Sequence, residues 1–120
     1  MAKYLLLIYG DQQAWAGADS AERQRIQAGH ERFGAAAGTA VLGGHELAPA
    51  SIATSLRAPR SGNRPDVTDA PFVESKEVVG GFYLIQVADL DEAMRLAALL
   101  PETAATYSSG VEIRPVVEPA

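Results

Sequence analysis

His30 is the residue of this sequence best placed for proton transfer near neutral pH, since histidine is the side chain that titrates there. It shares one face of a predicted helix with Ile26 and Phe33, at spacings of four and three residues. A carboxylate that orients such a histidine makes it a general acid or base. Asp11 comes just after an apolar strand and is the predicted partner. The alternative is a structural histidine that fills a gap in the core.

Two tyrosines on apolar strands are candidate binding residues. Tyr9 ends the first strand and Tyr83 lies in a later one. Each can direct its hydroxyl into a space between sheet and helices, where a buried O–H group needs a hydrogen-bond partner. Simple core packing is the other interpretation of both residues.

A polar segment with a rigid corner supplies three more candidates for substrate binding. Pro71 fixes the backbone between Asp69 and Phe72. Phe72 can form a pocket wall or plug the core, and Asp69 can bind a ligand or cap its own turn. Lys76 can hold a substrate carboxylate or form a solvated salt bridge.

The sequence gives little support for a metal or a cofactor. A metal site would need a carboxylate to join His30 and His45, and the spacing of the acidic residues shows no ligand pattern. There is no cysteine and no glycine-rich phosphate loop. We therefore expect neither a metal nor an organic cofactor.

The elements that must position these residues follow from hydrophobic patterns and cap signals. Residues 3–9 are apolar on both faces, which predicts a central strand. Asp19 and Ser20 begin a helix that ends at Gly38. The remaining predictions are a loop at 10–18, strands at 39–47 and 52–58, a loop at 59–66, an extended segment at 67–73, a strand at 81–87, a helix from Asp89 to Pro101 and a strand at 111–117.

This order predicts one α+β domain over residues 1–120, of the ferredoxin-like kind, in which two helices cover one face of an antiparallel sheet. The central strands are apolar on both sides, so the second face also needs a cover. A second copy of the chain is the simplest one, which predicts a homodimer.

Composition narrows the classes of partner. The chain carries a formal net charge of -5, and its basic residues are scattered apart from Arg57, Arg60 and Arg64, which fall in a predicted loop. We therefore expect no nucleic-acid partner. The longest apolar runs are too short to span a bilayer, so we also expect no membrane partner. The absence of cysteine fits the expected cytoplasmic location.

Several motifs resemble the YCII-related (DGPF-domain) family. Residues 67–77 read Val-Thr-Asp-Ala-Pro-Phe-Val-Glu-Ser-Lys-Glu, which is similar to the Asp-Gly-Pro-Phe motif and its Lys-Glu continuation. Gly-Gly-Phe-Tyr follows at 80–83, Tyr9-Gly10 ends the first strand, and Val-Glu-Ile-Arg-Pro occupies 111–115. Ala70 departs from the motif, which has glycine there, and would be strained if this position required a positive φ.

The resemblance implies a dimeric α+β barrel and, for the wider group, a His-Asp pair in a pocket with the histidine on the first helix. It implies no single reaction, because many members have none assigned. Together with the residues above, it favours a small cofactor-free enzyme that moves a proton in a lyase, isomerase or dehalogenase step on a small anionic organic molecule. The alternative is a non-catalytic dimeric module that binds a ligand or a regulatory protein.

Overall fold

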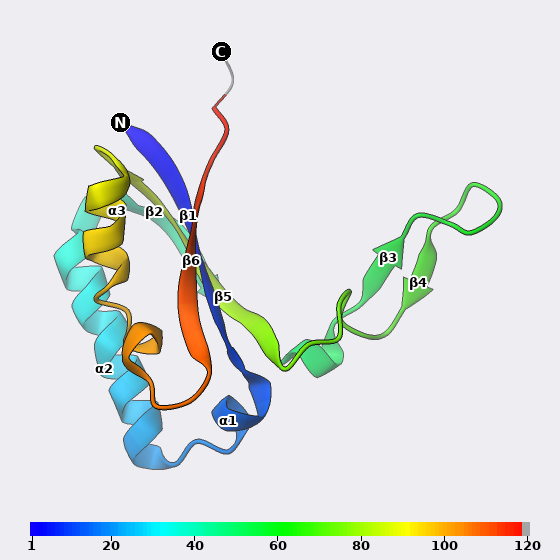
Figure 1. Cartoon of the computed structure of the whole chain (residues 1–120), viewed down its shortest axis with the longest axis horizontal. Coiled ribbons are helices and arrows are strands. Elements are labelled where there is room, and N and C mark those ends of the chain that lie inside the picture. Colours follow the sequence, from blue (N-terminus) through cyan, green and yellow to red (C-terminus); the bar gives the residue numbers. More distant parts are fainter. Residues whose placement is uncertain (119–120) are drawn as a thin grey trace.

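The computed structural model describes residues 1–118 and is built around a four-stranded antiparallel sheet of order β2-β5-β1-β6 (Figure 1). The central strands are β1 (Ala2–Asp11) and β5 (Glu77–Val87), and the edges are β2 (Val41–Glu46) and β6 (Ser109–Pro115). The predicted central position of the first apolar strand is confirmed. Residues 119–120, the end of the predicted domain, lie outside the described residues.

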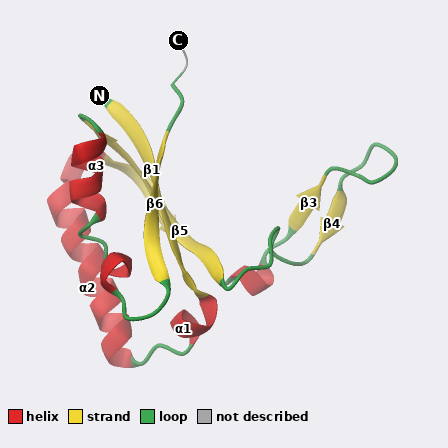
Figure 2. Cartoon of the chain, in the orientation of Figure 1, coloured by secondary structure: helices red, strands yellow, loops and turns green. Residues whose placement is uncertain are grey.

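Helices α2 (Ser20–Ala37) and α3 (Leu90–Ala97) lie on one side of this sheet (Figure 2). Both begin at the predicted caps, since Asp19 accepts a hydrogen bond from the Glu22 amide at 2.8 Å and Asp89 accepts one from the Glu92 amide at 3.0 Å. The predicted ferredoxin-like α+β fold is therefore confirmed. None of the helices within residues 1–118 is long and apolar enough to cross a bilayer.

The core lies between the sheet and these helices, because the strands alternate their side chains between two faces. The opposite face carries apolar side chains as well, among them Leu5, Leu7, Phe82 and Leu84, and none of the helices within the described residues covers it. We call it the open face. The buried core consists of Tyr4, Leu6, Ile8, Phe33, Ala37, Ile85, Val87, Ala93, Leu96, Ala97 and Leu100.

The strand predicted at 52–58 forms only in part and does not join the main sheet. After Pro49, a short 3-10 helix, η2 (Ala50–Ile52), turns the chain away from the sheet. Only β3 (Ser55–Arg57) forms there, and it pairs with β4 (Asp66–Thr68) in a separate two-stranded sheet. We call residues 53–76 the arm, and the rest of the described chain the body. Figure 1 shows the β3–β4 hairpin far from the helices.

Further boundaries differ from the predictions, among them the start of β5, which lies four residues earlier than predicted. Helix α1 (Gln12–Ala16) replaces part of the predicted loop, because the Asp11 carboxylate caps it. Helix α3 ends at Ala97, before Pro101, since the amides of Leu99 and Leu100 bond three residues back, as in a 3-10 turn. The remaining 3-10 helices are η1 (Gly38–Ala40) and η3 (Pro101–Ala104), and β6 begins two residues earlier than predicted.

Candidate functional site

His30 lies on the face of α2 that meets the sheet, where Phe33 is fully buried. Both of its ring nitrogens have side-chain partners. Nδ1 lies 2.7 Å from the Tyr83 hydroxyl, and Nε2 lies 2.9 Å from Oε2 of Glu102. The histidine side chain keeps 26% of its surface exposed, so the ring is held between two partners without being sealed from solvent.

Two contacts between α2 and η3 bring Glu102 to this histidine. The Pro101 ring packs so closely on Gly29 that an added Cβ would lie 2.6 Å from it. Arg25 donates a hydrogen bond from Nη1 to the Pro101 carbonyl at 3.0 Å. These contacts fix the position of Glu102, which is 5% exposed.

The second carboxylate oxygen of Glu102, Oε1, is buried and has no hydrogen-bond partner among the described residues. An unpaired buried oxygen costs free energy, so Glu102 depends strongly on its bond to His30. The carboxylate therefore accepts the Nε2 proton and fixes the orientation of the imidazole.

Tyr83 completes the chain of hydrogen bonds from β5. Burial, and after it the charge of Glu102, raises the pKa of its hydroxyl above the usual 10. The hydroxyl thus keeps its proton at neutral pH and donates it to Nδ1. The tautomer that satisfies all three residues carries its proton on Nε2, and the order of donation is Tyr83 to His30 to Glu102.

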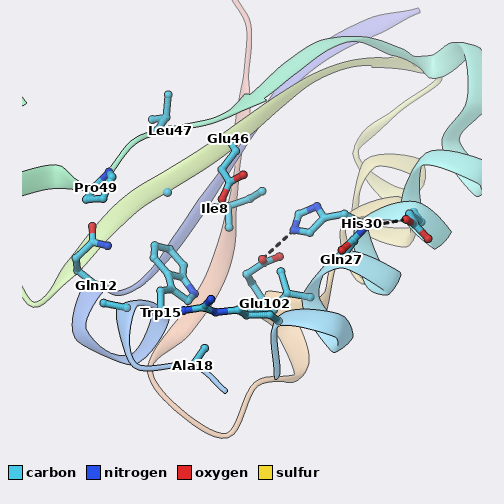
Figure 3. Close-up of a pocket in the computed structure, with 15 residues that line it drawn as sticks. Ile8, Gln12, Trp15, Ala18, Gln27, His30, Glu46, Leu47, Pro49 and Glu102 are labelled. Carbon is cyan, nitrogen blue, oxygen red and sulfur yellow. Dashed lines mark hydrogen bonds and ion pairs between the residues drawn. The ribbon is translucent and has the colours of Figure 1, made fainter. Parts of the chain in front are cut away.

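A cavity of about 800 Å³ opens beside this chain of hydrogen bonds (Figure 3). Its volume falls in the range of small-molecule sites. Figure 3 shows His30, Glu46 and Glu102 around a common space, with Trp15 and Pro49 on the far side. The lining residues come from β1, α1, α2, the end of β2, the start of β5 and η3; they are Ile8, Gln12, Trp15, Ala16, Ala18, Arg23, Ile26, Gln27, His30, Glu31, Glu46, Leu47, Pro49, Gly80 and Glu102.

Trp15 forms an aromatic wall of the cavity because two glycines lie under its ring. A Cβ added at Gly10 would lie 2.3 Å from the indole, and one added at Gly80 would lie 2.4 Å from it. These glycines are in adjacent strands, so a side chain on either would displace the ring. The Asp11 cap that begins α1 thereby also sets the position of the wall.

The charged groups at the cavity are mixed in sign. Arg23 is the single lysine or arginine among the lining residues, and it forms no ion pair with any residue of 1–118. Glu31 accepts a hydrogen bond from Gln27 at 3.3 Å. Glu46 and Glu102 add two more carboxylates. The cavity therefore offers one free cation in mainly acidic surroundings.

The structure does not bring Asp11 to His30. Oδ1 of Asp11 accepts hydrogen bonds from the amides of Gln13 at 2.9 Å and Ala14 at 3.3 Å. Its other oxygen lies 3.7 Å from Nζ of Lys76. Glu102 takes the place that the sequence analysis gave to Asp11, and Asp11 acts on the site through the helix that carries Trp15.

The other predicted binding residues are dispersed. Tyr83 reaches His30, whereas Tyr9 lines a shallower cavity of about 470 Å³ at the ends of β1 and β6. Lys76 is largely exposed beside Asp11. Asp69 and Phe72 lie exposed in the arm, where the Arg57 guanidinium sits 3.7 Å from the centre of the Phe72 ring. These four residues do not line the His30 cavity.

Glu102 and Trp15 are the residues that the sequence analysis missed. Each stands in a segment without periodicity, and only tertiary packing brings them to His30. The single available signal was the helix stop at Pro101, next to Glu102. Within residues 1–118, no three histidine, aspartate or glutamate side chains are grouped as metal ligands.

The whole described fold matches one family. The profile of the YCII-related domain covers residues 2–119. The chain belongs to the YCII-related family. An uncharacterised protein of Rhizobium meliloti (strain 1021) is 35% identical in an alignment 117 residues long, which covers 94% of this chain and 90% of that protein. Family membership is thus established along the whole chain.

The segment that resembles the Asp-Gly-Pro-Phe motif lies in the arm of this YCII-related chain. None of the described residues other than glycine has a positive φ, so Ala70 adopts an ordinary backbone conformation. Its carbonyl accepts a hydrogen bond from the Ser55 hydroxyl at 2.6 Å. Alanine therefore fits this position without left-handed strain.

Proposed function

We propose that this chain is a small enzyme that binds a small anionic organic molecule in the His30 cavity and moves a proton on it. The observation that carries the proposal is the hydrogen-bonded chain of Tyr83, His30 and Glu102, of which His30 and Glu102 line the cavity. A buried carboxylate on Nε2 stabilises the imidazolium that forms when the ring takes up a second proton. The Tyr83 hydroxyl can then rotate and accept from Nδ1–H.

The ligand class follows from the wall of the cavity. Trp15 and Leu47 offer apolar surface, and Arg23 offers the unpaired cation for one carboxylate. The glutamates would repel a second negative group, which favours a monoanion. In the proposed step the Tyr83 hydroxyl turns away from Nδ1 of His30, a C–H bond beside a carbonyl of the ligand breaks, the proton goes to Nδ1, and the electron pair stays on the ligand. An isomerase returns the proton to another atom, whereas a lyase or dehalogenase step expels a leaving group.

The test is hydrogen exchange at such an acidic carbon. Small 2-oxo and 3-oxo monocarboxylates in deuterated buffer are followed by proton NMR, with and without the protein. We expect the wild type to accelerate exchange and His30→Ala to lose at least about a hundredfold of that rate. His45→Ala is the matched control, because His45 lies exposed on β2 and does not line the cavity. Equal exchange by wild type and His30→Ala would contradict the proposal.

A second candidate is a non-catalytic ligand-binding module. It is favoured by the same hydrogen bonds, since a histidine whose two nitrogens are both satisfied is also a good structural residue. Trp15 is the sole tryptophan and lines the cavity, so its fluorescence reports binding. Binding that changes this emission without any exchange catalysed by His30 would favour the module over the enzyme.

Under either function, we propose that the chain works as a homodimer packed through the open face. Leu7 pairs with Phe82 and Leu5 with Leu84 across the central strands, which gives this face a continuous apolar centre. Monomers rarely leave such a surface in water. Sedimentation over a range of concentrations tests this part by itself, with Leu7→Glu and Leu84→Glu together as the variant that should separate the subunits.

A further inference from the structure

The arm extends the molecule well beyond the size of a compact chain. The radius of gyration is 16.3 Å. A compact chain of this length has about 13.6 Å. Figure 1 shows the cause, since the β3–β4 hairpin projects on the side of the sheet opposite the helices. The arm and the open face therefore border the same space.

The arm has a defined internal structure but little packing of its own. Arg57 donates a hydrogen bond to the Phe72 carbonyl and covers the Phe72 ring, and Ser55 bonds to Ala70. Yet a two-stranded sheet by itself is only marginally stable in water. Leu56 and Val67 are paired across the strands and remain 57% and 64% exposed. This pair is the apolar surface that a partner would cover.

The charge of the hairpin loop indicates what that partner is. Arg57, Arg60 and Arg64 fall within ten residues that hold no acidic side chain, from 56 to 65. Over residues 53–76, four basic and three acidic side chains give the whole arm a formal charge of +1, so the body carries a formal charge of -6. The loop is thus complementary in sign to the body of another copy of the same protein.

We propose that the arm clasps a second copy of this chain that is docked on the open face, so that each subunit of a two-fold dimer holds the other. The proposal rests on the homodimer proposed above and adds to it the surface that makes the dimer tight. A copy seated on the open face lies where the arm points. Two-fold symmetry then places both arms in equivalent contacts. The Leu56–Val67 pair buries apolar surface on the partner, and the arginines of the loop meet its acidic surface.

The main test removes the apolar pair. Leu56→Glu and Val67→Glu together should raise the dimer dissociation constant by at least about a hundredfold, because two aliphatic side chains lose their burial. Analytical ultracentrifugation measures it. Leu90→Glu and Met94→Glu together are the matched control, since these exposed side chains lie on α3, on the other side of the sheet. The control should keep the wild-type constant.

Two further variants separate the possible results. One replaces residues 56–67 by an Asn-Gly turn, which keeps the Ser55–Thr68 pairing and should dissociate like the glutamate variant. The other, Arg60→Gln with Arg64→Gln, should weaken the dimer severalfold at low salt and remove most of its salt dependence. Circular dichroism verifies that each variant is folded.

The outcomes distinguish the arm from the dimer itself. If the shortened variant keeps the wild-type dissociation constant while the Leu7→Glu and Leu84→Glu variant dissociates, the clasp is refuted and the dimer through the open face stands. If the wild type sediments as a single subunit at about 100 μM, both the clasp and the dimer through the open face are refuted. Neither result bears on proton exchange by His30, which is measured separately.

Discussion

The body and the arm of this molecule place the same kind of side chain in opposite surroundings. Phe33, in the body, has no exposed surface, and its ring packs on Tyr83 with the centroids 4.6 Å apart. Phe72, in the arm, is 54% exposed and meets one guanidinium. The body therefore holds its residues by close packing from several elements, whereas the arm holds them by local contacts.

The segment that resembles the Asp-Gly-Pro-Phe motif and the candidate site lie in different parts of the molecule. The segment that most resembles a family motif, residues 67–77, belongs mainly to the arm. The cavity takes its residues from six separate elements of the body. The motif-like segment of the arm is continuous in sequence, whereas the residues of the candidate site are far apart in sequence and come together only in the folded chain.

The largest expected effect contrasts the two phenylalanines. Phe33→Ala should lower the free energy of unfolding by about 3–5 kcal/mol, through lost burial and the cavity that remains. Phe72→Ala should cost about 1 kcal/mol or less, since it loses mainly a cation–π contact at the surface. Urea unfolding of the two variants measures both. Similar losses in the two variants would show that the arm is as well packed as the body.

Two glycine-to-alanine variants test how closely the body packs on Trp15, the aromatic wall of the cavity. Gly80→Ala places a methyl group against the Trp15 indole and should cost about 1–3 kcal/mol. It should also shift the Trp15 emission maximum. Gly110→Ala is the control in the neighbouring part of the sheet, because nothing lies within 4 Å of the added Cβ. An unchanged emission in Gly80→Ala would mean that the indole is not seated on this glycine.

The fold could be predicted because its signals are local. The two-faced apolar run of β1 indicated a central strand, and the caps Asp19 and Asp89 fixed where α2 and α3 begin. The arm could not be predicted as a separate unit. Its strands have three residues each, too few for periodicity to show, and η2 redirects the chain by backbone geometry.

The site was predicted only in part, for a related reason. His30 stood out because histidine is rare in this chain and fell on an apolar face. Its carboxylate partner depends on Gly29 accepting the Pro101 ring, a contact over 72 positions of sequence. Asp11 was the nearer candidate in predicted topology, but its Oδ1 accepts from the amides of α1 and its Oδ2 lies beside Lys76 instead.

A smaller effect on stability is expected from removal of the Tyr83 hydroxyl, which bonds to His30. Tyr83→Phe should cost about 0.5–1.5 kcal/mol at neutral pH through the lost hydrogen bond to His30. Because folding raises the pKa of Tyr83, its contribution is fully present below pH 10 and is lost as the pH rises through the folded value. The variant should therefore lose less stability than the wild type at alkaline pH.

Thermal unfolding between neutral pH and about pH 11 measures this alkaline loss. Tyr107→Phe is the companion variant, because burial and, after it, a hydrogen bond to Glu22 raise the pKa of that hydroxyl at a separate place in the body. The two effects should add in the double variant. If Tyr83→Phe lost as much stability at alkaline pH as the wild type does, the raised pKa of Tyr83 would not be a cause of that loss.

The smallest expected effect concerns the loss of stability at acidic pH. Hydrogen bonds from Arg25 and then from Tyr107 lower the pKa of Glu22 from 4.5 to about 2. A lowered folded pKa gives stability that is present above pH 4.5 and is lost as the pH falls toward 2. Glu22→Gln should flatten the loss of stability in this window, which urea unfolding at several acidic pH values measures.

Glu92→Gln is the comparison variant, because the Glu92–Arg95 pair lies within α3, whereas the arginine of the Glu22–Arg25 pair also contacts η3. Arg95 lowers the pKa of Glu92 in the same way, but Arg25 also bonds to the Pro101 carbonyl and so supports η3. Glu22→Gln should therefore change the acid profile more than Glu92→Gln does. The difference should persist when the arm is shortened, because both pairs lie in the body. If shortening the arm abolished it, the body would depend on the arm, and the contrast between the two regions would fail.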